Sequence, residues 1–116
     1  MKGERLPNAA RAIVPERKVK EYLLSETHPD GRGKARFFAA HGFSAESWQV
    51  LADALERHAA AHPVSDEEAT SFGVRYIVDG KLQAPDGRAS QVRSVWFIDV
   101  DSDVPRLVTA YPSPRR

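Results

Sequence analysis

The sequence has no cysteine and no long apolar run, and these absences exclude several classes of protein. Without cysteine, the 116 residues can form neither disulfides nor thiolate metal sites, which is typical of cytoplasmic proteins. No stretch of about 18 apolar residues is present, and the polar, basic start lacks the apolar segment of a signal peptide. We therefore expect a cytoplasmic protein without membrane contact, with a single domain at residues 1–112 and a disordered tail at 113–116.

The chain also lacks a strong net charge, because its formal charge is +1 at pH 7. The charges are nevertheless unevenly placed. Residues 1–41 hold nine Lys/Arg and five Asp/Glu, whereas residues 42–70 hold one Lys/Arg and six Asp/Glu. A polyanion would therefore meet the N-terminal part or the C-terminal part of the chain rather than the acidic middle.

Apolar residues at helical spacing predict three helices in the first half of the chain. The first covers Glu16–Leu24 and the second covers Lys34–His41, with Gly42 suited to a left-handed helix end. The third helix is predicted to begin at a cap formed by Ser44 and to stop before Pro63.

The second half of the chain alternates with a period of two, which predicts strands. Residues 64–70 are acidic and are predicted to be a linker, and the strands are expected at Val74–Val78, Val92–Val100 and Arg106–Tyr111. A short apolar run around Ile13 could add a fourth strand. The predicted fold class is α+β, with three N-terminal helices packed on one face of a three- to four-stranded antiparallel sheet.

Large apolar residues on the inward faces of these elements should form the core. The predicted core residues are Tyr22, Leu23, Phe37, Phe38, Trp48, Leu51, Leu55, Tyr76, Trp96 and Ile98.

One candidate site lies between the first two helices. His28 and Lys34 flank a glycine-rich segment that starts a helix, where backbone N–H groups favour an anion. His28 could act as a general base, because the usual pKa of histidine is close to neutrality. The alternative is a plain turn between helices that carries exposed charges.

A second candidate set lies on the strands and comprises Arg75, Arg93, Arg106, Thr109 and Tyr111. Simple alternation places Leu107, Thr109 and Tyr111 on one face of their strand, so the two hydroxyl groups could line a cleft. The alternative is that the threonine is simply a good strand former and the tyrosine is half-buried.

His58 and His62 are four residues apart on the third predicted helix, which is a spacing that can bind a metal. The motif glutamate of zinc proteases and a third ligand are both missing from this segment. The pair is therefore expected to border the core, and we expect neither a metal nor a cofactor.

Short motifs are spread over almost the whole chain: Leu6-Pro7-Asn8-Ala9, Tyr22-Leu23-Leu24, His28-Pro29, Gly33-Lys34-Ala35, Phe37-Phe38, Gly42-Phe43 and Val108-Thr109-Ala110-Tyr111-Pro112. Together they resemble a small bacterial family of unknown function, found as stand-alone proteins and at the C-terminal tip of polymorphic toxins. The order of helices before sheet also resembles the barnase–EndoU–colicin–RelE superfamily of metal-independent ribonucleases.

This second resemblance implies an RNA substrate and a site on the open face of the sheet. His28 would be the general base or acid, Lys34 and Arg75 would hold the phosphate, and Thr109 and Tyr111 would donate hydrogen bonds or position the substrate. The chain departs from such nucleases in its small net charge and in its acidic third helix.

A non-enzymatic alternative remains open. The domain could be a binding module, such as an immunity protein or antitoxin that docks by its sheet edge or acidic helix, or an adaptor of a phage or secretion system. The predicted partners are therefore RNA in one case and a cognate antitoxin, immunity protein or toxin in the other. The sequence leaves the oligomeric state open.

Overall fold

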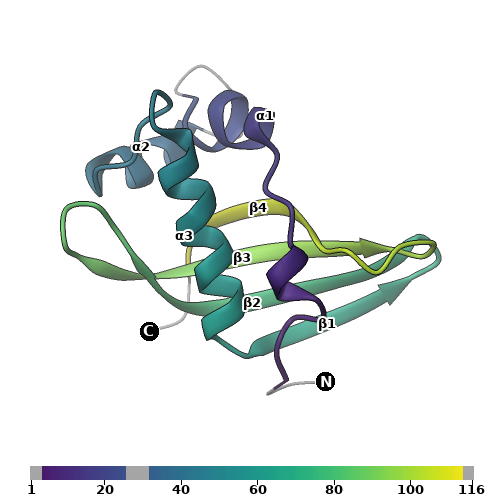
Figure 1. Ribbon diagram of the computed structural model, residues 1–116. Helices are drawn as coiled ribbons and strands as arrows, with labels where there is room; N and C mark the ends of the chain where they lie inside the picture. The colour runs from purple at the N-terminus through teal and green to yellow at the C-terminus, as the bar shows by residue number, and fades with distance from the viewer. Residues whose placement is uncertain (1–3, 26–31, 114–116) are drawn as a thin grey trace.

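The computed structural model describes residues 4–25 and 32–113, and Figure 1 shows its helices on one side of an antiparallel sheet. The elements in chain order are η1 (Ala9–Arg11), α1 (Glu16–Lys18), η2 (Val19–Leu23), α2 (Arg32–Ala40), α3 (Trp48–Ala61), β1 (Val64–Thr70), β2 (Gly73–Gln83), β3 (Ala89–Asp99) and β4 (Arg106–Pro112). The predicted α+β class, with helices before the sheet, is confirmed.

The first two predicted helices are present near their expected bounds. The π-helical turn η2 continues α1, and it buries Val19 and Leu23 completely. α2 ends at Ala40, and Gly42, two residues further on, has a left-handed φ of +97°. The N–H of Phe43 bonds back to the carbonyl of Phe38 at 3.1 Å, which satisfies a carbonyl of the last turn as expected.

The third helix starts later than predicted. It begins at Trp48 rather than just after Ser44. The Ser44 hydroxyl instead accepts a hydrogen bond from the backbone N–H of Ser47 at 3.3 Å, so it caps a turn that precedes the helix. Within the described residues, no helix combines the length and apolar character needed to cross a membrane.

The four strands form a meander in the order β1-β2-β3-β4, and each neighbouring pair is antiparallel. The predicted linker at residues 64–70 is wrong, because this segment is the edge strand β1. Charged side chains are tolerated there because an edge strand meets water on its outer side. Ile13 does not supply a strand of the sheet, although it forms one parallel bridge with Arg106.

The core lies between the helices and one face of the sheet. Of the predicted core residues, Leu23, Phe38, Leu51, Leu55 and Trp96 are buried. Tyr22, Phe37, Trp48 and Tyr76 pack against this core with part of the side chain exposed, and Ile98 is also half-buried. The core residues that the prediction omitted include Val19, Phe43, Val78, Val92 and Leu107.

Candidate functional site

Lys34 is the centre of a polar cluster where α2 lies beside the edge strand β4. Its ammonium donates hydrogen bonds to the hydroxyl of Tyr22 and to Oγ1 of Thr109, the latter at 3.1 Å. The same nitrogen lies 4.5 Å from the ring centroid of Tyr22 and 5.7 Å from that of Tyr111. All four side chains are half-buried. The cluster therefore holds a cation among three hydroxyl-bearing residues, and part of each side chain is exposed to solvent.

The electrostatics of this cluster favour the ionised form of Tyr22. Burial alone would raise the pKa of the phenol. Hydrogen bonds from Lys34 and Thr109, together with the positive charges of Lys34 and Lys18, outweigh burial and hold the pKa below its usual value of 10.0. The lowered pKa increases the fraction of Tyr22 that is present as phenolate, which is the form of the side chain that can accept a proton.

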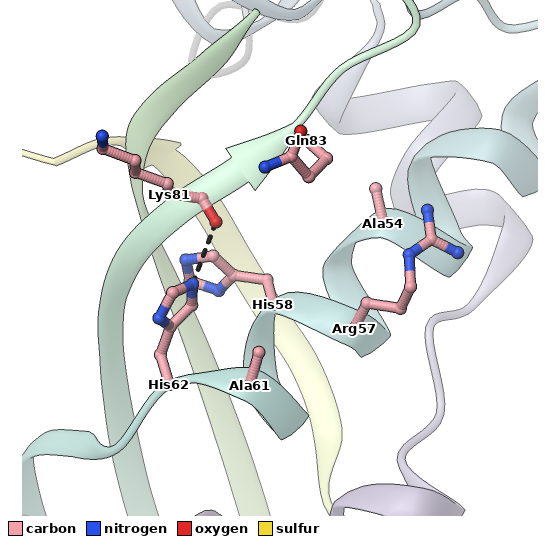
Figure 2. A pocket seen from close by; sticks show the side chains of 7 residues that line it. All are labelled: Ala54, Arg57, His58, Ala61, His62, Lys81 and Gln83. Atoms are coloured by element: carbon pink, nitrogen blue, oxygen red, sulfur yellow. Dashed lines mark hydrogen bonds between the residues drawn. The ribbon is translucent and has the colours of Figure 1, made fainter. Parts of the chain in front are cut away.

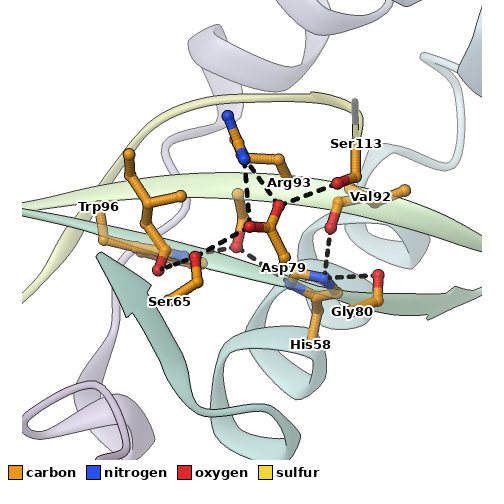
Figure 3. Close-up of polar contacts among 10 residues, drawn as sticks. His58, Ser65, Asp79, Gly80, Val92, Arg93, Trp96 and Ser113 are labelled. Carbon is orange, nitrogen blue, oxygen red and sulfur yellow. Dashed lines mark hydrogen bonds and ion pairs between the residues drawn. The ribbon is translucent and has the colours of Figure 1, made fainter. Parts of the chain in front are cut away.

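A second polar network, centred on Arg93 and Asp79, lies next to Tyr111 on the face of the sheet away from the helices. The guanidinium of Arg93 donates to both carboxylate oxygens of Asp79, at 2.9 and 3.2 Å (Figure 3). Asp79 also accepts hydrogen bonds from the hydroxyls of Ser65 and Ser113, at 2.9 and 3.0 Å. Ser113, the first residue of the predicted tail, thus takes part in this network.

The charges of this second network are fixed by its hydrogen bonds. Burial would raise the pKa of Asp79, but the bonds from Arg93 and the two serines hold it below its usual value. The hydrogen bond to Asp79 is the main reason why the pKa of Arg93 is raised, and a hydrogen bond to Tyr111 adds to it. Burial acts in the opposite direction and is outweighed. Arg93 is therefore a permanent cation beside the Tyr111 ring.

A β-bulge decides which residues of β4 can join the site. Val95 pairs with Thr109, whereas its neighbour Trp96 pairs with Leu107, so Val108 is an extra residue in β4. The prediction that Leu107 shares a face with Thr109 and Tyr111 is therefore wrong. Leu107 faces the core with only 1% of its surface exposed, and the two hydroxyl residues follow the opposite face.

The predicted site residues are only partly brought together. Lys34, Thr109 and Tyr111 meet in the cluster described above. Arg75 lies two strands away on β2, where its guanidinium pairs with Glu68 of β1 at 2.8 Å. His28 lies outside the described residues.

His58 of α3 and His62, which follows the last residue of that helix, both form hydrogen bonds to the backbone of the sheet. They line a pocket of about 440 Å³ between the end of α3 and the end of β2, together with Ala54, Arg57, Ala61, Lys81 and Gln83 (Figure 2). His62 Nε2 bonds to the Lys81 carbonyl at 3.0 Å, which satisfies part of the backbone where β2 extends beyond β1. Within residues 4–25 and 32–113, no three or more side chains of the metal-ligating types lie close enough together to hold a metal ion.

His58 has both ring nitrogens engaged beneath the sheet (Figure 3). Nε2 lies 2.9 Å from the carbonyl of Val92 and 3.1 Å from that of Gly80, so it must carry the proton. Nδ1 then accepts from the hydroxyl of Ser94 at 3.0 Å. Burial is the main reason why the pKa of His58 is lowered, which keeps the ring neutral.

Comparisons with known proteins agree with this architecture. A family described as a domain of unknown function (DUF6883) matches residues 5–114. The chain belongs to this family. No curated protein matches this sequence. Among solved structures, a chain of the "Contact-dependent growth inhibition toxin - immunity protein complex from Klebsiella pneumoniae 342" is similar, with a TM-score of 0.71 and 17% identity over 90% of this chain and 96% of that chain. At this identity, the likeness establishes a shared fold.

Sequence reasoning placed two members of the site in other roles. Tyr22 was predicted to be a core residue, whereas in the structure its hydroxyl accepts a hydrogen bond from Lys34. Arg93 was named only as one of three arginines on the predicted strands, without a partner. Tyr22 lies near the end of one predicted helix, and Lys34 lies at the start of the next. This placement could have indicated that the two side chains meet. The pairing of Arg93 with Asp79 follows from the β2–β3 register, which the sequence did not specify.

Proposed function

We propose that this domain is a metal-independent ribonuclease of a bacterial toxin system and that it cleaves RNA at the Lys34 cluster. The observation that carries the proposal is the contact of the Lys34 ammonium with the hydroxyls of Tyr22 and Thr109. A cation fixed beside a phenol with a lowered pKa supplies both the positive charge and the proton acceptor that phosphodiester cleavage requires.

The reaction needs no group beyond those in the chain. A base takes the proton of the ribose 2′-hydroxyl, the 2′-oxygen attacks phosphorus, and an acid gives a proton to the leaving 5′-oxygen. The products are a 2′,3′-cyclic phosphate and a free 5′-hydroxyl. Tyr22 is the proposed base, and Lys34 stabilises the negative charge that develops on the phosphate. Thr109 and Tyr111 position the phosphate. His28 is the proposed acid, on the evidence of the sequence.

Induced expression in bacteria, with total RNA analysed on a gel, tests the proposal. The wild type should degrade RNA, and Lys34→Ala or His28→Ala should slow cleavage by roughly 10²–10⁴-fold. Lys20→Ala is the matched control, because Lys20 is an exposed helical lysine that pairs with Glu16 at 3.1 Å, outside the cluster. Intact RNA with the wild-type protein, or equal cleavage by Lys34→Ala, would contradict the proposal.

Tyr22→Phe separates catalysis from packing. The variant keeps the ring that Lys34 contacts and removes only the hydroxyl. We expect loss of cleavage with a melting temperature within a few degrees of the wild type. A large loss of stability with retained cleavage would instead show that the hydroxyl serves the fold.

A non-enzymatic binding module is the second candidate, and the sheet margin supplies an observation in its favour. Phe72 and Val100 are 77% and 76% exposed at one end of the sheet, and a backbone hydrogen bond of 2.9 Å joins them. The neighbouring edge strand β1 exposes Asp66, Glu67 and Glu68. An apolar tip beside an acidic edge suits a basic protein partner. Harmless expression with intact RNA favours this second candidate.

A further inference from the structure

We infer that the face of the sheet away from the helices carries a base-stacking subsite for single-stranded RNA, formed by Phe97 and Arg106. The inference rests on the proposed ribonuclease function and names the part of the substrate that this surface would hold. Phe97 of β3 and Arg106 of β4 are register partners. The guanidinium carbon of Arg106 lies 5.3 Å from the ring centroid of Phe97, so the two side chains form one platform.

The orientation of this platform is fixed by its neighbours. Arg106 donates from Nε and Nη2 to the two carboxylate oxygens of Asp99, at 3.2 and 3.4 Å. Phe97 covers the backbone of Gly73 so closely that a Cβ at that glycine would lie 2.7 Å from its ring. The Arg106 side chain is still 50% exposed. A planar guanidinium held over a ring and open to solvent is a surface on which a nucleobase stacks.

A second cation borders the platform on the next strand. Arg75 of β2 is the other register partner of Phe97, so Arg75, Phe97 and Arg106 form one row across three strands. The Arg75 guanidinium pairs with Glu68 at 2.8 Å and its side chain is 47% exposed. An arginine at this place can bind a phosphate next to the stacked base, which gives Arg75 a binding role rather than a catalytic one.

The platform lies at a suitable distance from the Lys34 cluster. Phe97 and Val95 point to the same face of β3, two residues and roughly 7 Å apart. Val95 is the register partner of Thr109, which contacts Lys34. RNA whose scissile phosphate meets Lys34 would therefore place an adjacent base over Arg106. Because stacking needs an exposed base face, the ligand must be single-stranded.

Fluorescence anisotropy with a labelled single-stranded ten-nucleotide RNA tests the subsite. Every ribose carries a 2′-O-methyl group, so that the probe binds but cannot be cleaved. Phe97→Leu and Arg106→Lys should each weaken binding by between about 5- and 150-fold, which is the usual effect of losing one stacked base. Phe97→Leu keeps an apolar cover over Gly73, and Arg106→Lys keeps the charge, so both variants remove the platform with little change in packing or net charge.

Two matched controls separate stacking from general surface effects. Val50→Ala changes an exposed apolar residue of α3, away from the row. Arg88→Lys changes an arginine that pairs with Asp86 at 2.6 Å and is 56% exposed, similar to Arg106. Both controls should bind the probe as the wild type does, and all variants should melt within a few degrees of it.

Unchanged binding by Arg106→Lys and Phe97→Leu would overturn the subsite, as would a wild-type protein that does not bind the probe. An equal loss in the Arg88→Lys control would also overturn it. Cleavage of unmodified RNA is measured separately. Cleavage without any effect of the platform variants on binding refutes the subsite alone. Specific binding through Phe97 and Arg106 without cleavage supports the subsite and refutes the nuclease proposal.

Discussion

Replacing Ser94 by alanine should remove the central link of the hydrogen-bond chain buried beneath β3. The indole N–H of Trp96 donates to the Ser94 hydroxyl at 2.8 Å, and that hydroxyl donates to Nδ1 of His58 at 3.0 Å. Ser94 and Trp96 are fully buried, and His58 is only 2% exposed. The alanine variant therefore leaves one buried donor and one buried acceptor without their partner.

The magnitude of the loss follows from these two orphaned groups. Each buried polar group that loses its hydrogen bond costs about 1–3 kcal/mol, so Ser94→Ala should lower the free energy of unfolding by about 2–6 kcal/mol. A domain of this size has about 5–15 kcal/mol in total. The expected fall in melting temperature is roughly 8–24 °C, at about 4 °C for each kcal/mol.

Urea and thermal denaturation followed by far-ultraviolet circular dichroism measure this effect without relying on Trp96 fluorescence. Ser102→Ala is the matched control, because the exposed Ser102 hydroxyl accepts a hydrogen bond from the backbone N–H of Val104 at 3.1 Å in a surface turn. Water can replace that bond, so its loss should cost less than about 1 kcal/mol. Equal effects of the two substitutions, or a change below about 0.5 kcal/mol for Ser94→Ala, would refute the reasoning.

Two further predictions concern the same side of the sheet. Burial lowers the pKa of His58 in the folded protein, so the unfolded chain binds its proton first and stability should fall as the pH drops below about 6.5, by up to about 1.4 kcal/mol per pH unit. Urea denaturation at pH 7.5 and 5.5 should show this loss in the wild type and much less of it in His58→Gln; an identical loss in both would contradict the assignment. Gly80→Ala should destabilise the fold by about 1–3 kcal/mol, because the new Cβ would lie 2.3 Å from the His62 ring. Gly33→Ala in α2 has nothing within 4 Å and should be neutral or stabilising in the same thermal assay, and a stable Gly80→Ala would show that the His62 ring moves freely.

The fold could be predicted wherever the local sequence pattern agrees with the tertiary structure. The helical spacing of Trp48, Leu51 and Leu55 predicted the third helix, and the alternation around Trp96 predicted the central strand. The strand β1 was missed because Asp66, Glu67 and their neighbours are poor strand formers. Pairing with β2 on one side and exposure to water on the other override that weak propensity, and neither is visible in the segment itself.

The site could be predicted only in part, because its geometry depends on register. The residue types at Lys34, Thr109 and Tyr111 were sufficient to nominate them. Strict alternation nevertheless assigned the hydroxyl residues of β4 to the face of Leu107. One inserted residue, Val108, reverses that assignment, and no turn signal marks such a bulge in the sequence.

The small net charge of the chain is compatible with RNA binding because its acidic residues fix the positions of arginines. Arg75, Arg93 and Arg106 each pair with a carboxylate on a neighbouring strand. Such pairs hold a planar guanidinium in a defined orientation and reduce its long-range attraction for phosphate. Lys34 differs from these arginines, because its ammonium donates hydrogen bonds to the hydroxyl groups of Tyr22 and Thr109. The proposed surface therefore orients a base through the arginines, while the Lys34 ammonium supplies the positive charge that draws the phosphate to the reacting position.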